Sequence, residues 1–152
     1  MRVKSLNEFL FEQVEAEDKL KLVILTKTKK SDTAEVLKEA AERKGFEVFI
    51  GEVDNLSLVE TKTAYALKHR ESGMEFPIDR DNTVILSRRG VISNTYTRTL
   101  LHNLEKHNFF CVNSLESMEI CENKFLTSEA LESVGLPVPK TAILPSEEAI
   151  ED

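Results

Sequence analysis

The regular alternation of short apolar runs with amphipathic segments constrains the fold of this chain most strongly. Residues 21–26 (KLVILT) form a compact run rich in β-forming residues, which is typical of a strand buried on both faces of a parallel sheet. A helix follows, begun by Ser31 or Asp32 and stopped by Gly45, and residues 46–50 have the pattern of the next strand. This order predicts a right-handed βαβ unit.

The same alternation repeats further along the chain. Residues 83–87 form another buried-strand run, residues 94–107 carry apolar side chains at helical spacing, and residues 109–112 return as a strand. Between the two repeats, residues 63–67 and 74–77 flank turn-forming residues, which predicts a hairpin appended to the sheet. The sequence therefore predicts an α/β fold with a mainly parallel sheet flanked by helices.

The two ends of the chain depart from this pattern. A capping box formed by Ser5 and Glu8 predicts a short amphipathic helix at the start. After residue 113 the pattern becomes helical, over 115–121 and 124–134, and residues 140–144 are expected to form a strand. We therefore divide the chain into a helical extension (1–18), an α/β domain (19–113), and linker helices with the start of a further domain (114–152).

Composition excludes several classes of function. The 27 acidic side chains outnumber the 20 basic ones, and a net charge of -7 repels nucleic acid. The apolar runs are far too short to cross a bilayer, and polar residues interrupt any signal core near the start. Cys111 and Cys121 are then expected to be free, buried thiols in the reducing cytoplasm.

The candidate binding residues follow the predicted strands, because ligands of open α/β sheets bind beyond the carboxyl ends of the strands. Three loops meet this condition, at residues 26–30, 87–90 and 113–114. The first two carry cations in an otherwise acidic chain, which suits an anionic small molecule or a carboxylate held by arginine. Two alternatives remain: the lysines of 27–30 form a solvated turn, and Arg88 and Arg89 form structural ion pairs.

Other common site signatures are missing from the sequence. The five glycines are scattered singly, so neither a dinucleotide fingerprint nor a phosphate loop can be written. His69, His102 and His107 lack the spacing of metal ligands and are expected at the surface. No set of residues with the spacing of a catalytic group or a metal site can be chosen.

One longer segment resembles a known family. Asn113-Ser114, the stretch 122–125 (ENKF) and the stretch 131–141 (LESVGLPVPKT) resemble the entry to the catalytic region of ATP-grasp ligases, and are similar to RimK-like enzymes. The runs 22–27 (LVILTK) and 84–90 (VILSRRG) resemble the first and central strands of that family. The similarity covers most of the chain after Asp18.

The resemblance implies a Rossmann-like pre-ATP-grasp domain followed by the first elements of an ATP-grasp domain. Such enzymes use ATP and Mg²⁺ to activate a carboxylate as an acylphosphate, which an amine then attacks. By this resemblance Lys124 binds the ATP phosphates, Arg88 holds a substrate carboxylate, and Lys27 and Asn113 line the same crevice. Asn123 replaces the family's usual Asp, although an amide can still cap the helix.

In the family, the parts that cover the phosphates and hold Mg²⁺ lie beyond the last residue of this chain. We therefore expect the N-terminal, substrate-side domain of a carboxylate-amine ligase that acts on a small-molecule or peptide carboxylate, is inactive alone, and exposes apolar surface that favours a homo-oligomer. The alternative is a stand-alone flavodoxin-like binding or regulatory module without catalysis. Thr26 and Lys27, where a receiver domain carries acidic residues, disfavour a phospho-acceptor.

Overall fold

The protein was analysed as a computed structural model that describes residues 19–28, 31–62, 64–88 and 90–143. The chain divides into two compact units, Met1–Leu115 and Glu116–Asp152, and each is described here by itself. The helix predicted around Ser5 and Glu8 lies outside the described residues.

The first unit contains a parallel sheet, as the sequence predicts. Its described strands are β1 (Lys21–Thr26), β2 (Glu47–Glu52), β6 (Thr83–Ser87) and β7 (Phe110–Val112), in the order β2-β1-β6-β7, and each neighbouring pair is parallel. The central strand β1 has neighbours on both sides, and its residues 23–25 are fully buried. Burial on both faces explains why β1 is apolar at consecutive positions instead of alternating positions.

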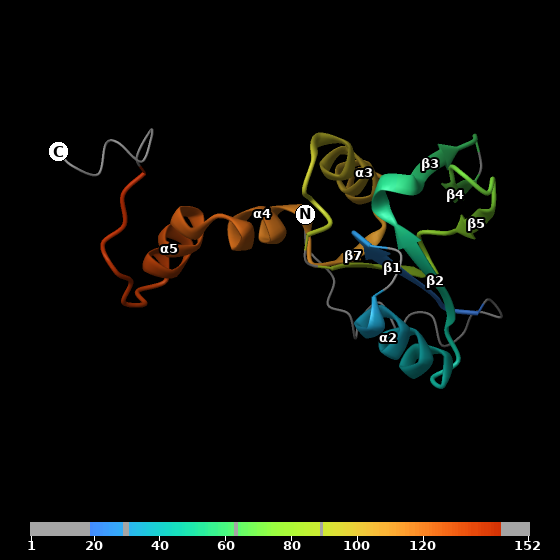
Figure 1. Ribbon diagram of the computed structural model, residues 1–152, viewed down its shortest axis with the longest axis horizontal. Helices are drawn as coiled ribbons and strands as arrows, with labels where there is room; N and C mark the ends of the chain where they lie inside the picture. Colours follow the sequence, from blue (N-terminus) through green and yellow to red (C-terminus); the bar gives the residue numbers. More distant parts are fainter. Residues whose placement is uncertain (1–18, 29–30, 63, 89, 144–152) are drawn as a thin grey trace. The chain divides into compact units, whose positions relative to one another are not determined.

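Two helices connect the parallel strands on opposite faces of the sheet. α2 (Asp32–Glu42) links β1 to β2, whereas α3 (Thr95–Lys106) links β6 to β7 in the opposite direction across the sheet. Because both crossovers are right-handed, opposite directions place the two helices on opposite faces. Figure 1 shows α2 below the strands and α3 above them. The predicted Rossmann-like layering is confirmed.

Side chains and tight turns fix the ends of these helices. The Ser31 hydroxyl accepts a hydrogen bond from the Ala34 amide at 3.3 Å, and the Asn94 side chain accepts one from the Thr97 amide at 3.0 Å. Shortly after the last residues of α2 and α3, Gly45 (φ 90°) and Asn108 (φ 61°) adopt the left-handed conformation that ends a helix. The cap at Ser31 and the stop at Gly45 agree with the sequence prediction.

The connection from β2 to β6 carries a small antiparallel sheet. A 3₁₀ turn, Val53–Asn55, leads into β3 (Leu56–Glu60), which pairs with β4 (Tyr65–His69), and β4 pairs with β5 (Glu75–Ile78). The predicted hairpin therefore exists as β4 and β5, but its expected place on the parallel sheet is wrong. It joins β3 in a separate sheet, because the chain turns sharply after β2 and supplies a third strand that was not predicted.

This small sheet packs over the same face as α3. The path from β2 back across β1 to β6 runs in the same direction as the path from β6 to β7, so right-handedness assigns both connections to one face. The contacts agree: the Phe49 ring on β2 stacks on Phe76 of β5 with centroids 4.9 Å apart, and Tyr65 meets Phe109 edge to face. The core of the first unit lies between these layers.

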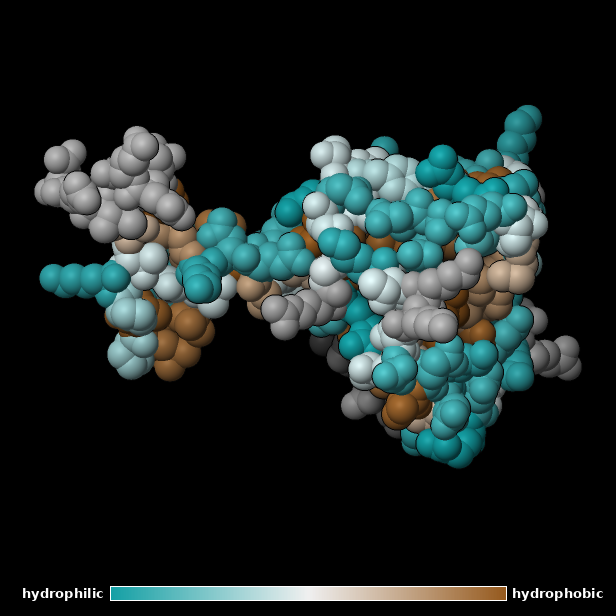
Figure 2. Space-filling model, in the orientation of Figure 1, coloured by the Kyte–Doolittle hydropathy of each residue, from teal (hydrophilic) through white to brown (hydrophobic). Residues whose placement is uncertain are grey.

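The second unit contains α4 (Leu115–Glu122), whose first residue belongs to the first unit, and α5 (Lys124–Ser133). The Asn123 side chain accepts hydrogen bonds from the Phe125 and Leu126 amides at 2.9 and 3.2 Å, so the expected cap by an amide is confirmed. Figure 2 shows brown, hydrophobic surface on this unit. Its exposed large apolar side chains are Leu126, Leu131, Val134, Leu136 and Ile143.

The strand expected at residues 140–144 does not form over its described part. Residues 140–143 have no regular secondary structure, and the Thr141 hydroxyl donates locally to the Pro139 carbonyl. A β-forming sequence becomes a strand only when another strand pairs with it, and the described part of the second unit contains helices but no strand. Among the described helices, none combines the length and the apolar composition that a bilayer crossing requires.

Candidate functional site

The predicted binding residues of the first unit lie at one edge of the parallel sheet, the one formed by the carboxyl ends of its strands. Lys27, Arg88 and Asn113 directly follow β1, β6 and β7, which are neighbours in the sheet and run in the same direction. From the centre, the chain leads from β1 outward to β2 and from β6 outward to β7. The pair β1 and β6 is therefore the switch point of the topology, where open α/β sheets bind their ligands.

Arg88 is held at this switch point with part of its charge buried. Its backbone amide donates to the Leu25 carbonyl at 3.2 Å, so the loop after β6 is fixed to β1. Its side-chain nitrogen Nη1 is buried and has no hydrogen-bond partner among the described residues. The alternative interpretation of Arg88 was a structural ion pair, and within the described residues no such ion pair is found. A buried guanidinium nitrogen without a partner is uncommon in folded proteins and calls for an explanation.

Ser87 adds a second unpartnered group beside Arg88. Its side chain is fully buried as the last residue of β6, and within the described part of the chain its hydroxyl oxygen has no hydrogen-bond partner. Sequence reasoning placed Ser87 in the candidate loop but did not single it out. A hydroxyl residue that ends an otherwise apolar strand was the available signal.

Asn113 has a structural task at the same edge. Its side-chain amide donates to the Ser87 carbonyl at 2.9 Å, which ties the end of β7 to the end of β6. Its backbone has φ 62°, in the left-handed region that asparagine tolerates better than most residues. Asn113 therefore shapes the edge that carries Ser87 and Arg88, and its exposed side keeps it available to a ligand.

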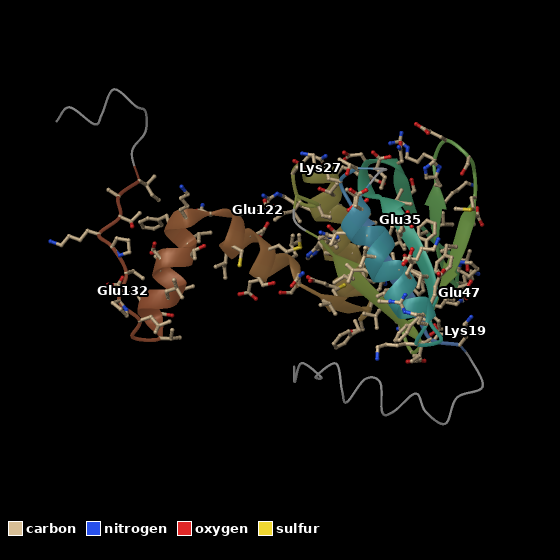
Figure 3. All side chains as sticks on the ribbon, turned by 60° about the horizontal axis from the view of Figure 1, so that its bottom comes forward. Lys19, Lys27, Glu35, Glu47, Glu122 and Glu132 are labelled. Carbon is tan, nitrogen blue, oxygen red and sulfur yellow. The ribbon has the colours of Figure 1, made fainter. Side chains whose placement is uncertain are left out.

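Lys27 is exposed at the same end of the sheet. A Cβ atom placed on Gly90 would lie 3.6 Å from the Lys27 Cδ, so the lysine stem runs beside the loop that follows Arg88. Figure 3 shows Lys27 at the end of the sheet opposite Lys19 and Glu47. The exposure of Lys27 agrees with a solvated turn, and its position agrees with a contribution to the electrostatic potential at the switch point. Lys29, Lys30 and Arg89 lie outside the described residues.

Lys124 belongs to the second unit, where it is the exposed first residue of α5. The Asn123 side chain already accepts hydrogen bonds from two of the first amides of α5, so these amides are not free to bind a phosphate. A phosphate at this helix end would therefore be bound mainly by the Lys124 ammonium. Its role toward ATP stays a prediction.

Two hollows of the first unit lie away from the switch point. One of about 500 Å³ opens at the amino ends of the strands, near Lys19, Lys21 and Glu47, and another of about 380 Å³ lies between β3 and α3. Neither is lined by Lys27, Arg88 or Asn113. No group of three or more histidine, cysteine, aspartate or glutamate side chains in the described ranges is arranged to hold a metal ion.

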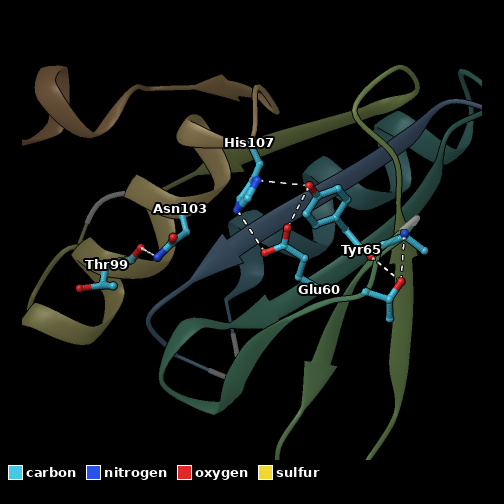
Figure 4. A network of polar contacts seen from close by, with 7 residues as sticks. Glu60, Tyr65, Thr99, Asn103 and His107 are labelled. Atoms are coloured by element: carbon cyan, nitrogen blue, oxygen red, sulfur yellow. Dashed lines mark hydrogen bonds and ion pairs between the residues drawn. The ribbon is translucent and has the colours of Figure 1, made fainter.

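His107 is not the simple surface residue that the sequence suggested. Its Nδ1 lies 3.2 Å from the Tyr65 hydroxyl and its Nε2 lies 3.4 Å from a Glu60 carboxylate oxygen, and the side chain is 23% exposed (Figure 4). The tertiary contact with the small sheet, which sequence spacing does not reveal, explains the difference. His102 is exposed as predicted.

Both cysteines are free, as predicted, but their environments differ. Burial, together with the nearby Glu105 carboxylate, raises the pKa of the Cys111 thiol to about 12. Cys121 is exposed on α4, so its predicted burial is wrong. The short helix α4 leaves this position facing solvent.

The fold is an α/β fold that is also found in a solved structure of an ATP-grasp ligase. No protein-family model matches the chain. The chain is 25% identical over 127 residues to a probable alpha-L-glutamate ligase of Haemophilus influenzae, an alignment that covers 82% of this chain and 42% of the relative. The chain thus spans less than half the length of this curated relative.

Two solved structures share the fold. The macrocyclase MdnB from Microcystis aeruginosa matches with a TM-score of 0.59 and 22% identity, over 86% of this chain and 56% of that one. A RiPP-associated ATP-grasp ligase from Chryseobacterium gregarium, in complex with ADP and a leader and core peptide, matches with a TM-score of 0.60 and 17% identity, over 87% and 46%. The resemblance to RimK-like ATP-grasp ligases is confirmed as a distant homology over part of their length.

Proposed function

We propose that this chain is the substrate-side portion of an ATP-dependent carboxylate-amine ligase, and that its switch point binds the carboxylate that is to be joined. The observation that carries the proposal is the buried, unpartnered Nη1 of Arg88 at the point where the sheet topology reverses. The distant relationship to a probable glutamate ligase supports the same class of reaction.

The physical argument starts from the buried Nη1 of Arg88, which has no hydrogen-bond partner among the described residues. A buried guanidinium nitrogen without a partner lowers the stability of the folded protein, since the water that it loses is not replaced. A carboxylate ligand restores the missing hydrogen bonds, and the planar fork of arginine fits a carboxylate in two-point contact. The neighbouring Ser87 hydroxyl is a further unpartnered group that can donate to a carboxylate oxygen.

In this proposal each residue has a limited task. Arg88 binds and orients the carboxylate, Lys27 raises the local positive potential in a chain of net charge -7, and Asn113 holds the edge in shape through Ser87. Bound ATP with Mg²⁺ would supply the phosphoryl group that activates the acid. Lys124, as a point charge, would contact the phosphates, and the described residues offer no cluster for the metal itself.

The acid could be a small amino acid such as glutamate or a peptide terminus. The Chryseobacterium ligase holds a leader and core peptide, which supports a peptide for this chain as well. We place the reaction in the cytoplasm, on the basis of the two free thiols. The exposed apolar side chains of the second unit would favour self-association.

The proposal can be tested by NMR titration of the 152-residue chain with glutamate and with a short peptide, each as the free acid and as the amide. We expect the acids, but not the amides, to shift the backbone resonances of Lys27, Arg88 and Asn113. The variant Arg88→Gln should lose this response, whereas Arg80→Gln, which changes an exposed arginine away from the switch point, should keep it. Equal shifts with acid and amide would refute a carboxylate site.

Stability separates the proposed role of Arg88 from a structural one. If the guanidinium waits for a ligand, Arg88→Gln should leave the free energy of unfolding of the ligand-free chain unchanged or raise it, because an unpaired buried charge is removed. A large loss of stability would instead mean that Arg88 has a structural partner.

The nucleotide part of the proposal is tested by calorimetry. Mg-ATP titrated into the 152-residue chain is expected to release no measurable heat, since Lys124 alone offers too few contacts to hold a nucleotide. In a longer protein that includes the ATP clamp, Lys124→Ala should weaken ATP binding. Micromolar binding by the 152-residue chain, or unchanged affinity of the longer variant, would contradict the assigned roles.

A further inference from the structure

The groove between β3 and α3 is a second feature of the first unit, distinct from the switch-point edge. It has a volume of about 380 Å³ and is lined on one side by Leu58 and Glu60 of β3, and on the other by Tyr96, Thr99 and Asn103 of α3 and by His107, which directly follows the helix. The three helix residues are separated by three or four positions and therefore lie on one face of α3.

The hydrogen-bond parity of β3 shows which of its peptide groups face this groove. Just before and just after β3, the Asn55 carbonyl accepts from the Arg70 amide and the Thr61 amide donates to the Ala64 carbonyl. Residues two apart in an antiparallel strand point their peptide groups to the same side, so 57 and 59 also bond to β4. The amides and carbonyls of Leu58 and Glu60 therefore point away from β4, and the described residues provide no partner for them.

The opposite edge of the small sheet is blocked at one of its two outward positions. By the same parity, Glu75 and Pro77 of β5 point outward, since the His69 amide donates to the Met74 carbonyl. Pro77 has no amide hydrogen, and its carbonyl accepts from the Lys21 ammonium at 2.9 Å. Proline on an outer strand is a common device against strand addition. Of the two edges, β3 thus keeps a free donor and acceptor pair at consecutive outward positions.

Tyr96 closes one end of the groove and indicates what fits in the rest. Its hydroxyl donates to the carbonyl of Leu56, which is the outward position next to Leu58. The tyrosine thus occupies the place where the amide of an added strand would donate. Further along α3, the side chains that face Leu58 and Glu60 are the shorter Thr99 and Asn103, whose amide is bonded to the carbonyl of Thr99 (Figure 4).

We propose that this groove binds an extended peptide segment of a partner polypeptide as an added strand on β3, with a lysine or arginine side chain of that segment beside Glu60. The outward groups of Leu58 and Glu60 supply the backbone hydrogen bonds, as in other cases of strand addition. Glu60 supplies the charge preference. Its side chain is 51% exposed at the groove, and its carboxylate is held there by the Tyr65 hydroxyl and by His107. The negative charge of this carboxylate would repel an acidic peptide.

The first test uses a labelled peptide of alternating threonine and valine residues with one central lysine, and follows single amides of the protein by NMR hydrogen exchange. In the free protein the amides of Leu58 and Glu60 should exchange quickly, and those of Ser57 and Val59 slowly. Saturation with the peptide should slow Leu58 and Glu60 alone. Slow exchange of Leu58 and Glu60 without peptide would mean that another part of this chain, or a second copy, covers the edge, and would overturn the proposal.

Variants on the exposed surface of α3 provide a matched pair for the second test. Thr99→Trp fills the groove, whereas His102→Trp places the same bulk on the same helix outside it. Measured by fluorescence anisotropy, peptide affinity should fall at least roughly tenfold in the first variant and stay unchanged in the second. No binding by the unvaried protein, or equal losses in both variants, would contradict the groove as the site.

The charge preference is tested on both partners. Glu60→Gln should lower the affinity for the lysine peptide by roughly threefold, which is the scale of one exposed ion pair. The variant should also no longer prefer the lysine peptide over a peptide with glutamate in place of lysine. Unchanged preference would remove Glu60 from the site. The peptide is used with an amidated C-terminus, and Thr99→Trp should lose this peptide but keep the response of the switch point to glutamate, so failure of the carboxylate site and failure of this groove are distinguishable.

Discussion

Gly51→Ala is expected to destabilise the first unit, although alanine is usually the better residue in a strand. Gly51 is a buried residue of β2, and its backbone does not have the positive φ that requires glycine. A Cβ atom built on it would lie 2.4 Å from Leu56 Cδ1 and 3.0 Å from Phe49 Cε1. Ordinary contacts of this kind are 3.4 Å or longer, so the first overlap is about 1 Å.

The sign of the effect depends on whether Leu56 can move. Leu56 is fully buried at the start of β3, which leaves its side chain little room to withdraw. Overpacking of this kind costs about 1–3 kcal/mol. The gain from replacing glycine by alanine in a strand is about 0.5–1 kcal/mol and offsets part of this. We therefore expect a net loss of about 1–2 kcal/mol in the free energy of unfolding.

Urea unfolding followed by circular dichroism measures this loss. With a dependence of about 2 kcal/mol per molar urea, the midpoint should fall by roughly 0.5–1 M. The same change made in a Leu56→Ala background should be nearly neutral, because the main overlapping atoms are then absent. A stabilising Gly51→Ala in the natural background, or the same loss in both backgrounds, would refute the packing argument.

Three further predictions concern the helix cap and the two thiols. Asn94→Ala should lower stability by about 1 kcal/mol in urea unfolding, through loss of the cap on Thr97, and Asn94→Ser should recover most of it; equal losses would rule out the cap as the cause. At pH 8 a thiol reagent should modify Cys121 quickly and Cys111 only on unfolding, because a pKa of about 12 leaves roughly one Cys111 in 10⁴ as the thiolate. Fast modification of both thiols in the folded protein would contradict the burial of Cys111. Above pH 9 the unfolded chain loses the Cys111 proton, while the folded chain keeps it until about pH 12, so the unfolded state binds fewer protons and the free energy of unfolding falls as the pH rises. Cys111→Ala should show a smaller fall over this pH range, and an identical dependence of stability on pH would refute the raised pKa of Cys111.

The parallel sheet and its helices could be predicted because their signals are local. The run 21–26 and the run 83–87 are apolar at successive positions, and this pattern alone defines β1 and β6 with their observed bounds. Ser31, Asn123 and Gly45 mark helix ends through short-range hydrogen bonds and a backbone angle. Such features depend on residues within one turn, so a single sequence is enough to find them.

The small sheet and the pairing of polar groups could not be predicted in the same way. β3 has residues that alternate weakly, and only its pairing with β4 makes it a strand. His107 meets Glu60 and Tyr65 across more than forty residues of chain. The missing partner of Arg88 is likewise a property of the folded surroundings. The sequence could place Arg88 at the end of a strand, but could not show that its Nη1 is buried without a hydrogen-bond partner among the described residues.

The small sheet has a further consequence for how the first unit is used. The connection from β2 to β6 is a crossover between parallel strands, which proteins usually build from a helix. A helix satisfies its backbone groups internally, whereas a sheet leaves two edges that must be covered or paired. Here Pro77 and Lys21 block the β5 edge at one outward position, and Tyr96 occupies β3 at Leu56. The outward groups of Leu58 and Glu60 are consecutive along β3, so the strand addition that we propose there would pair them and cover this edge.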